Sequence, residues 1–280
     1  MLPVADESAT LIALDHWTLI RADGPDAQDF LHRQLTADIA ALAPQTSTLA
    51  GYCMPDGRLI ATTFVFWRDQ ALHLALPASV APAVLRRLRL FVLRDRVTLS
   101  TCDLPIAGRL DNETPAAGSC VNDGGITWIG LPGDRPRALA IGATGGETSR
   151  SESWTAGEID AGLPMVVAET AGLFLPQSLR LDTLGGVSFR KGCYPGQEVV
   201  ARLHYRGKLK RVLVRADRRG GPCHAGDVIQ GPDQALGHIA ATTETAALAV
   251  VRLTALGMSG IAGQAQLTLK TQALQTAEAT

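Results

Sequence analysis

The spacing of apolar positions in the first hundred residues predicts strands and amphipathic helices within one region of the chain. An apolar run at 17–20 predicts a strand, and the Gly-Pro-Asp turn after it can begin a helix over the residues that follow. The segments 59–67 and 71–77 are rich in β-prone residues and are separated by a polar turn, so they predict an antiparallel hairpin. Apolar residues then recur at helical spacing over 81–92, which predicts an amphipathic helix with an arginine-rich outer side.

The pattern changes after residue 211. Residues 97–150 still predict short strands within the first region, but from 212 to 272 short β-prone segments alternate with Gly/Pro turns. Their spacing of roughly ten residues is typical of a small β-barrel or sandwich. We therefore expect an α+β fold in three parts: an α+β region over 1–211, a C-terminal β-barrel module over 212–272, and a tail over 273–280.

Composition is that of a globular protein with no bulk charge. The chain has 280 residues, of which 46% are hydrophobic and 19% charged, and this length suits two or three lobes. The formal net charge of −1 predicts neither a nucleic-acid binder nor a membrane-surface protein. The N-terminus lacks the basic region of a signal peptide, and no apolar run reaches the roughly 18 residues that span a bilayer. We expect a soluble protein of the cytoplasm.

The five cysteines do not form a recognisable ligand set. Their number is odd, their spacings are wide, and no C-x-x-C pair occurs. A disulfide framework or a self-contained zinc or iron–sulfur site is therefore poorly supported, and we expect no metal site. Cys193 is then either a single functional thiol or an ordinary core residue.

Residues 190–198, "RKGCYPGQE", form the most unusual segment of the chain and are called the signature segment below. Pro195 suits the first turn of a helix, and Glu198 would lie near its positive end, so Cys193 is expected just ahead of a short helix. The helix dipole together with Arg190 and Lys191 would favour the thiolate form of this cysteine. The glycines of the segment would allow positive φ angles or a close approach of the backbone to a partner.

A basic run continues from the signature segment to residue 211. Seven Lys and Arg residues stand against one Glu between 190 and 211, a local charge of +6. This run is either a solvated face or a docking surface for an anion: a polyglutamate tail, RNA phosphate or an acidic partner. Tyr194 and Tyr205 could stack on a base or ring, but two tyrosines give little support to direct binding of nucleic acid, which we do not expect.

The sequence "LGGVSFRKGCYPGQEVVAR" resembles the K-G-C-Y-x-G-Q-E signature of the YgfZ-type folate-binding proteins, which are relatives of the glycine-cleavage T-protein (aminomethyltransferase). The likeness extends upstream through "IDAGLP" and "FLPQ" and covers most of residues 15–211. It implies a three-lobed fold around a central folate cavity, with two intertwined lobes in residues 1–211.

The resemblance also assigns site residues. Trp17 and Trp154 match two tryptophans that are associated with folate, and Asp160 stands where T-protein relatives carry Glu in an E-A-G motif. Arg180 falls where the family pattern usually has Asn. A flat pterin suits an aromatic face, a carboxylate for its N–C–NH2 edge and cations for its glutamate tail. The expected folate-binding residues are Trp17, Trp154, Asp160, Tyr194, Gln197 and Arg202.

The function implied by the resemblance is that of a tetrahydrofolate-binding accessory protein for iron–sulfur cluster assembly or repair, with effects on tRNA modification by iron–sulfur enzymes. Its partners would be iron–sulfur assembly proteins or client enzymes. Cys193, assisted by Lys191 and Arg190, would act at the edge of the cavity as a nucleophile, a transient cluster ligand or a one-carbon acceptor. The alternatives are a folate-dependent aminomethyltransferase-like enzyme and an RNA-binding module that uses residues 190–211.

Overall fold

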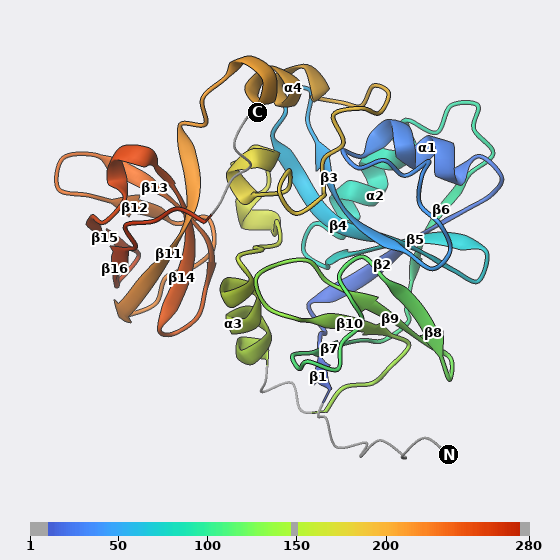
Figure 1. The fold of residues 1–280 in the computed structure, drawn as a ribbon, viewed down its shortest axis with the longest axis horizontal. Coiled ribbons are helices and arrows are strands. Elements are labelled where there is room, and N and C mark those ends of the chain that lie inside the picture. Colours follow the sequence, from blue (N-terminus) through green and yellow to red (C-terminus); the bar gives the residue numbers. More distant parts are fainter. Residues whose placement is uncertain (1–10, 147–150, 275–280) are drawn as a thin grey trace.

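The computed structural model describes residues 11–146 and 151–274. Within them the chain forms two five-stranded antiparallel sheets, a closed six-stranded barrel and four α-helices (Figure 1). The expected α+β class with a C-terminal barrel is therefore confirmed. The expected absence of a signal peptide concerns residues 1–10, which lie outside the described residues, as do residues 275–280 of the expected tail.

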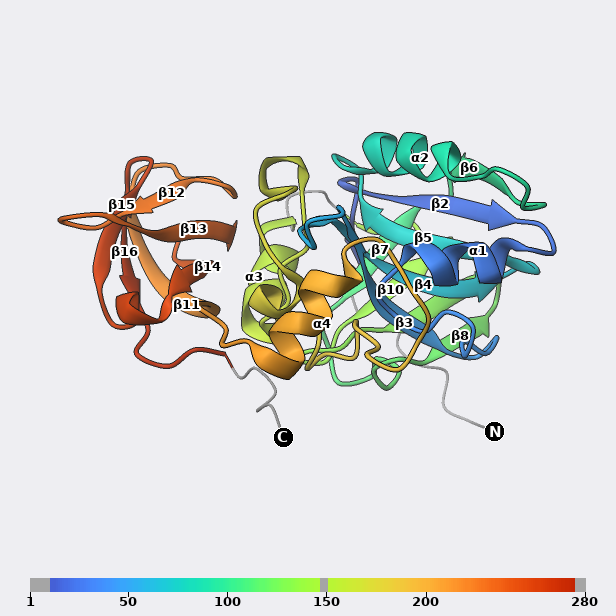
Figure 2. The same ribbon diagram turned by 90° about the horizontal axis from the view of Figure 1, so that it is seen from above.

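The first sheet has the strand order β3-β4-β5-β2-β6 and carries two helices on one face (Figure 2). The expected hairpin over 59–77 and the helix over 81–92 are both present. Both faces of the sheet are buried: Ile20 and Leu74 pack against the helices, whereas Leu19 and Phe64 face the second sheet. The elements are β2 (Trp17–Asp23), α1 (Ala27–Gln34), β3 (Ser47–Cys53), β4 (Leu59–Arg68), β5 (Ala71–Pro77), α2 (Ala81–Leu90) and β6 (Thr98–Cys102).

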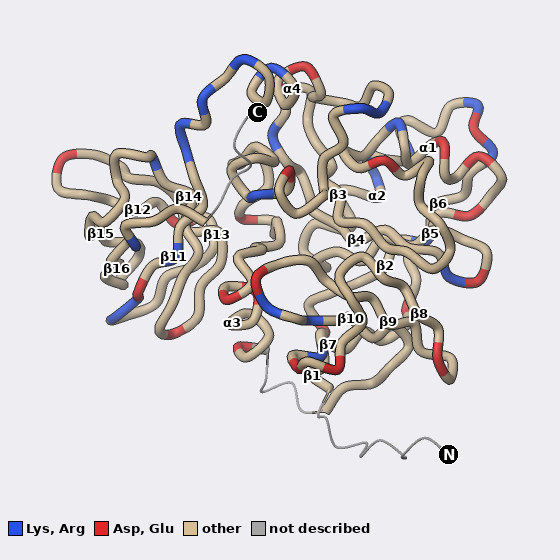
Figure 3. Tube along the Cα trace, in the orientation of Figure 1, with Lys and Arg blue, Asp and Glu red and all other residues tan. Residues whose placement is uncertain are grey.

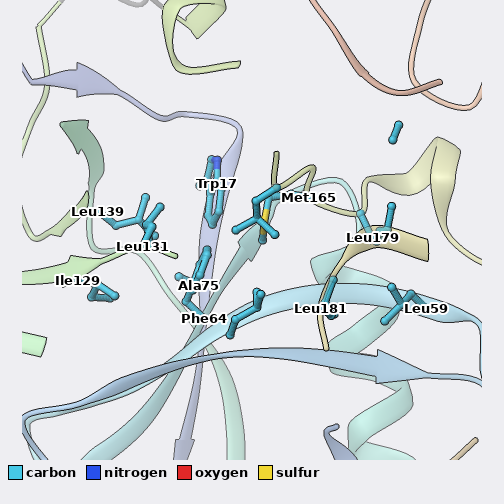
Figure 4. Close-up of a cluster of buried hydrophobic side chains, with 14 of the residues drawn as sticks. Trp17, Leu59, Phe64, Ala75, Ile129, Leu131, Leu139, Met165, Leu179 and Leu181 are labelled. Carbon is cyan, nitrogen blue, oxygen red and sulfur yellow. The ribbon is translucent and has the colours of Figure 1, made fainter. Parts of the chain in front are cut away.

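The second sheet has the order β1-β7-β10-β9-β8 and shares a hydrophobic core with the first. Ile129 and Leu139 from this sheet lie in the same buried cluster as Phe64 from the first (Figure 4). The strands are β1 (Ile12–Ala13), β7 (Ile106–Arg109), β8 (Cys120–Asp123), β9 (Ile126–Gly130) and β10 (Ala138–Ile141).

The barrel closes in the order β11-β14-β13-β12-β15-β16 around its own core of small aliphatic side chains. Alternation of buried and exposed residues along β16 shows the period of two that the sequence pattern predicts. The elements are β11 (Arg211–Gly220), β12 (Val228–Gln230), β13 (Ala235–Thr242), β14 (Ala246–Arg252), η4 (Leu253–Ala255), β15 (Ser259–Ala262) and β16 (Ala265–Leu269).

Helix α3 (Ser151–Ala161) lies between the barrel and the sheets and contacts β13, β14 and β1 (Figure 1). Two short 3-10 turns, η2 (Ala168–Thr170) and η3 (Pro176–Leu179), and helix α4 (Gln197–Arg206) complete the connection to β11. No helix in the described part of the chain is both long and apolar enough to cross a membrane.

A cluster of ion pairs joins the second sheet, the segment after η3 and the barrel. Asp134, in the loop before β10, lies 3.2 Å from Arg180 after η3 and 3.2 Å from Arg215 on β11. Arg180 is buried and has a left-handed backbone with φ 63°, and its guanidinium also donates to the carbonyl of Gly162. Arg180 is thus a structural residue where the second sheet and the barrel meet.

Candidate functional site: the central cavity and the signature segment

A cavity of about 620 Å³ lies where the first sheet, α3 and the barrel meet. Its volume is in the range of small-molecule and cofactor sites. The first sheet contributes the start of β2 and the end of β5, and the barrel contributes β13 and the loop after β11. The lining residues are His16, Trp17, Pro77, Ala78, Ser79, Thr155, Glu158, Met165, Val167, Glu169, Cys223, His224, Ala225, Ala240, Ala241 and Thr242.

Trp17 forms an aromatic wall of this cavity. Its ring is held on one side by Phe64, with ring centroids 6.2 Å apart and planes 17° from parallel. The edge-to-face contact with Trp154, at 6.5 Å, fixes it from another direction. Trp17, Phe64 and Met165 belong to the same core cluster (Figure 4), so the indole is 6% exposed and is oriented before any ligand arrives.

Trp154 does not line the cavity but supports the residues that do. It is fully buried, and its Nε1–H donates to Glu158 Oε1 at 3.1 Å. The Arg137 guanidinium lies 5.6 Å from the centre of the same ring. Gly108 makes room for this indole, because a Cβ at that position would lie 2.3 Å from Trp154 Cε3. The structure therefore places the second expected tryptophan behind the cavity wall, and its role in folate binding stays a prediction.

The carboxylate of the cavity belongs to Glu158, and Asp160 lies outside it. Residues two apart on a helix differ by about 200° in direction. Glu158 accordingly faces the cavity and the Trp154 indole, while Asp160 is exposed and is absent from the lining. That Asp160 binds folate therefore stays a prediction, and the structure adds Glu158 as the buried carboxylate of this cavity. Burial raises the pKa of Glu158 to about 7, although Arg137 and the Trp154 hydrogen bond act in the opposite direction.

The remaining polar groups of the cavity come from several elements, among them the residue before β2, η2 and the barrel. Burial lowers the pKa of His16, so its imidazole is neutral over a wider pH range. His224 and Glu169 also line the cavity, as does the buried thiol of Cys223, whose Sγ lies 3.6 Å from Thr242 Oγ1. The thiol that the structure places in the cavity is thus Cys223, which the sequence reading did not single out.

The signature segment precedes a helix as expected, but its details differ. Helix α4 begins at Gln197 after Gly196, which has φ +82°, so Pro195 stands ahead of the helix and not in its first turn. Glu198 lies in the first turn, as predicted. Cys193 is exposed. Among the described residues, none between 190 and 202 lines the cavity, so the structure does not place Cys193 at the cavity edge.

Lys191 fastens the signature segment to the end of α1. Its buried ammonium donates to the carbonyls of His32, Leu35 (2.6 Å) and Ala37 (3.1 Å). Burial lowers the pKa of Lys191 to about 8, and the ammonium lies 5.2 Å from the centre of the Tyr194 ring. The ammonium is thus bonded to backbone carbonyls around the end of α1, and its expected effect on the Cys193 thiol stays a prediction.

The other residues expected at the site have separate positions. Tyr194 is buried, and burial raises the pKa of its hydroxyl well above the usual range. Gln197 is half-buried, and its backbone N–H donates to the Tyr194 carbonyl at 3.2 Å. Arg190 and Arg202 are exposed. Among the described residues, no group of three or more His, Cys, Asp and Glu side chains is placed to hold a metal ion.

Comparisons with known proteins show which family and fold this chain resembles. The tRNA-modifying protein YgfZ of Enterobacter sp. (strain 638) is 34% identical over 229 residues, which cover 73% of this chain and 70% of that protein. The tRNA-modifying protein YgfZ of Klebsiella pneumoniae (strain 342) is 34% identical over 231 residues, with the same coverage of 73% and 70%. No protein-family model matches the chain.

Among solved structures, the glycine cleavage system aminomethyltransferase T from Bartonella henselae matches with a TM-score of 0.64 and 13% identity. The match covers 93% of this chain and 84% of that protein, so the three-part arrangement of sheets and barrel is that of the T-protein fold. On the strength of the sequence identity and coverage, the chain belongs to the YgfZ protein family.

Proposed function

We propose that this protein binds tetrahydrofolate, or a derivative of it, in the central cavity and supports tRNA modification by helping to assemble or repair iron–sulfur enzymes. The observation that carries the folate part is the pairing of one aromatic wall with one buried carboxylate inside a cavity of about 620 Å³. The tRNA part rests on the names of the curated relatives.

The residues of the cavity fit a reduced folate. The pterin ring carries an N–H and an NH2 group on one edge, and an ionised carboxylate can accept from both. Glu158 is the buried carboxylate of the lining, held in place by the Trp154 indole N–H. Trp17 and Met165 supply apolar surface for the flat ring, and His16 and His224 can bond to polar atoms of the ligand.

When bound, reduced folate supplies a carrier for one-carbon units. The residues of the chain would orient the bound folate and set the protonation state of Glu158. The Trp154 indole N–H holds the Glu158 carboxylate, and Arg137 packs on the same indole and acts on the carboxylate through its charge. The pKa of about 7 lets Glu158 exchange a proton near neutral pH. The Trp17 wall and the barrel residues Ala240 and Ala241 exclude water from one side of the cavity.

Cys193 is the proposed functional thiol, and its exposed position favours action toward a partner protein. It lies three residues before the N-cap of α4, beside the exposed Arg190. In this setting it could serve as a nucleophile, a transient cluster ligand or a one-carbon acceptor. Iron–sulfur assembly proteins or client enzymes would be the partners that reach it.

A second candidate function is that of a folate-dependent aminomethyltransferase. It is favoured by Glu158, because this chemistry needs a carboxylate near the reacting carbon and the cavity holds one with a pKa near neutrality. Production of methylene-tetrahydrofolate from an aminomethyl donor by the purified protein would support it.

The test of the first proposal is a calorimetric titration of the purified protein with tetrahydrofolate. We expect saturable binding that Trp17→Ala and Glu158→Gln each weaken by about tenfold or more, because each removes one recognition contact. Trp128→Ala, which changes a tryptophan outside the cavity lining, is the matched control and leaves binding unchanged. A folded wild type that does not bind would refute the folate site.

The accessory role is tested by complementation in cells that lack the protein. Cys193→Ala is expected to abolish the rescue of iron–sulfur-dependent tRNA modification while its affinity for tetrahydrofolate stays at the wild-type value. Full rescue by this variant would remove Cys193 from the mechanism.

A further inference from the structure

A second cavity, of about 290 Å³, lies at the junction of α4, the turn before β4 and the barrel. It shares no lining residue with the central cavity. Its walls come from the β3–β4 turn, the segment around η3, the end of α4, the linker to β11, and β14. The lining residues are Arg58, Leu173, Phe174, Leu175, Ser178, Leu203, Lys208, Leu209, Lys210, Arg211 and Val250.

The rim of this cavity is strongly basic. Arg58 is partly engaged, since it donates to the Leu173 carbonyl at 2.6 Å and lies 3.6 Å from Asp56. Lys208, Lys210 and Arg211 are exposed, and no acidic side chain among the described residues lies within ion-pair distance of any of them. Figure 3 shows these cations in succession along the connection from α4 to β11. Three neighbouring cations without counter-charges create a positive potential that attracts anionic groups.

The floor, in contrast, is aliphatic. Leu173, Leu175, Leu203 and Leu209 are half-buried around it. The apolar surface continues outward at Leu253, which is 49% exposed and whose N–H donates to the Lys210 carbonyl at 3.2 Å. A ligand that satisfies both features carries carboxylates or other anions beside a branched apolar group.

RNA and the folate tail fit this site less well. Sequence-independent RNA sites stack bases on exposed aromatic side chains, and the exposed aromatic of α4, Tyr205, is absent from the lining and packs edge-on against His204. A polyglutamate tail brings negative charge but no apolar group for the leucine floor. The separate linings of the two cavities also give no continuous path from the proposed folate site.

We propose that this second cavity docks an acidic segment of a partner protein, with a leucine-like side chain in the floor and flanking carboxylates on Lys208, Lys210 and Arg211. This inference goes beyond the proposed function and does not depend on folate binding. Helix α4 connects the two features: Cys193 precedes its start and Leu203 lies near its end. Leu203 lies about 9 Å along the helix axis from Gln197, so a docked partner would contact the end of α4 that is away from the thiol.

The experiment is fluorescence anisotropy of the full-length protein with a labelled peptide of alternating Glu and Leu residues. We expect saturable binding that Lys208→Gln, Lys210→Gln and Arg211→Gln together weaken by about tenfold or more. Leu209→Asn keeps the charge and is expected to weaken binding by about tenfold, because it removes apolar contact in the floor. The control Arg94→Gln with Arg219→Gln removes two exposed cations elsewhere and leaves binding unchanged.

Four outcomes of this experiment would count against the proposal. Equal binding by wild type and the neutralised variant, or an unchanged affinity in Leu209→Asn with an unchanged melting temperature, would overturn it. Binding of tRNA that is tighter than that of the peptide and lost in the same variants would assign the site to RNA. Displacement of the peptide by pentaglutamyl tetrahydrofolate, but not by the monoglutamate, would assign it to the folate tail.

Discussion

Glu158 makes the stability of this protein depend on pH in a way that a single substitution can isolate. Its pKa is about 7 in the folded protein against 4.5 as the ordinary value. Between these two values the folded state binds more protons than the unfolded state, so the stability contributed by this group falls as pH rises. Glu158→Gln removes the titration and keeps the size of the side chain.

The magnitude follows from the two pKa values. At about 1.4 kcal/mol for each pKa unit, the buried carboxyl destabilises the fold by about 0.8 kcal/mol at pH 5 and about 3.3 kcal/mol at pH 8. The attraction of Arg137 is already contained in the folded-state pKa, because Glu158 carries its negative charge only when it is ionised. What remains of the substitution is a change in packing and hydrogen bonding, which is the same at both pH values. The change with pH in the stability difference between wild type and variant therefore reports the titration of Glu158 alone.

The assay is urea unfolding of wild type and Glu158→Gln at pH 5 and pH 8. We expect the free energy of unfolding of wild type to fall relative to that of the variant by about 2.5 kcal/mol between the two pH values. All other titrating groups are common to both proteins and cancel. A difference that stays constant within about 0.5 kcal/mol would refute the assigned pKa and the burial argument behind it.

The same group predicts the pH dependence of ligand binding. Pairing with the pterin edge requires the ionised carboxylate, so the affinity for tetrahydrofolate is expected to rise as pH increases from 6 to 8 and to be flat in Glu158→Gln. Tighter binding at low pH would mean that the neutral acid is the binding form, contrary to the proposed pairing.

Three further predictions concern the signature segment. Lys191→Met removes the ammonium that donates to the carbonyls of His32, Leu35 and Ala37, of which the Ala37 carbonyl keeps the Ile39 N–H as a donor. The variant is expected to destabilise the fold by about 3 kcal/mol in denaturant unfolding, whereas the exposed Arg190→Met stays within about 0.5 kcal/mol. Gly196→Ala is expected to destabilise the fold by more than about 2 kcal/mol, because the φ of Gly196 is +82° and a Cβ would lie 2.4 Å from a backbone oxygen. The control Gly192→Ala is expected to be near neutral, since its Cβ would only meet an imidazole at 4.0 Å. Equal melting temperatures of the two variants would contradict this prediction. Ellman's reagent is expected to modify Cys193 faster than the buried cysteines, and the fast phase disappears in Cys193→Ala; a fast phase that persists would show that another thiol is exposed.

Sequence patterns over short segments predicted most of the strands and helices. The strand at Trp17, the hairpin over 59–77, the helix after Ala81 and the barrel beyond residue 211 all follow from apolar spacing and turn residues. The signature segment likewise indicated the helix that begins near Gln197. These features arise within ten or so neighbouring residues, where hydrophobic period and turn chemistry act directly.

The site residues were harder to predict. The resemblance indicated Trp17, Trp154 and Asp160, but the structure places Glu158 in the cavity and Trp154 behind it. A prediction of a helix over residues 151–161 would have indicated Glu158. Trp154 and Glu158 are four residues apart and share a helix face on which Asp160 does not lie.

The sequence by itself determined the family, the alternation of elements and the composition of the signature segment, because each is encoded in short stretches of residues. Only the tertiary structure decided which charges meet which partners. Lys191 is drawn to carbonyls more than 150 residues earlier in the chain, and the cavity is assembled from β2, α3 and the barrel. Such contacts depend on how layers pack in space, and burial then sets the pKa of each group they enclose.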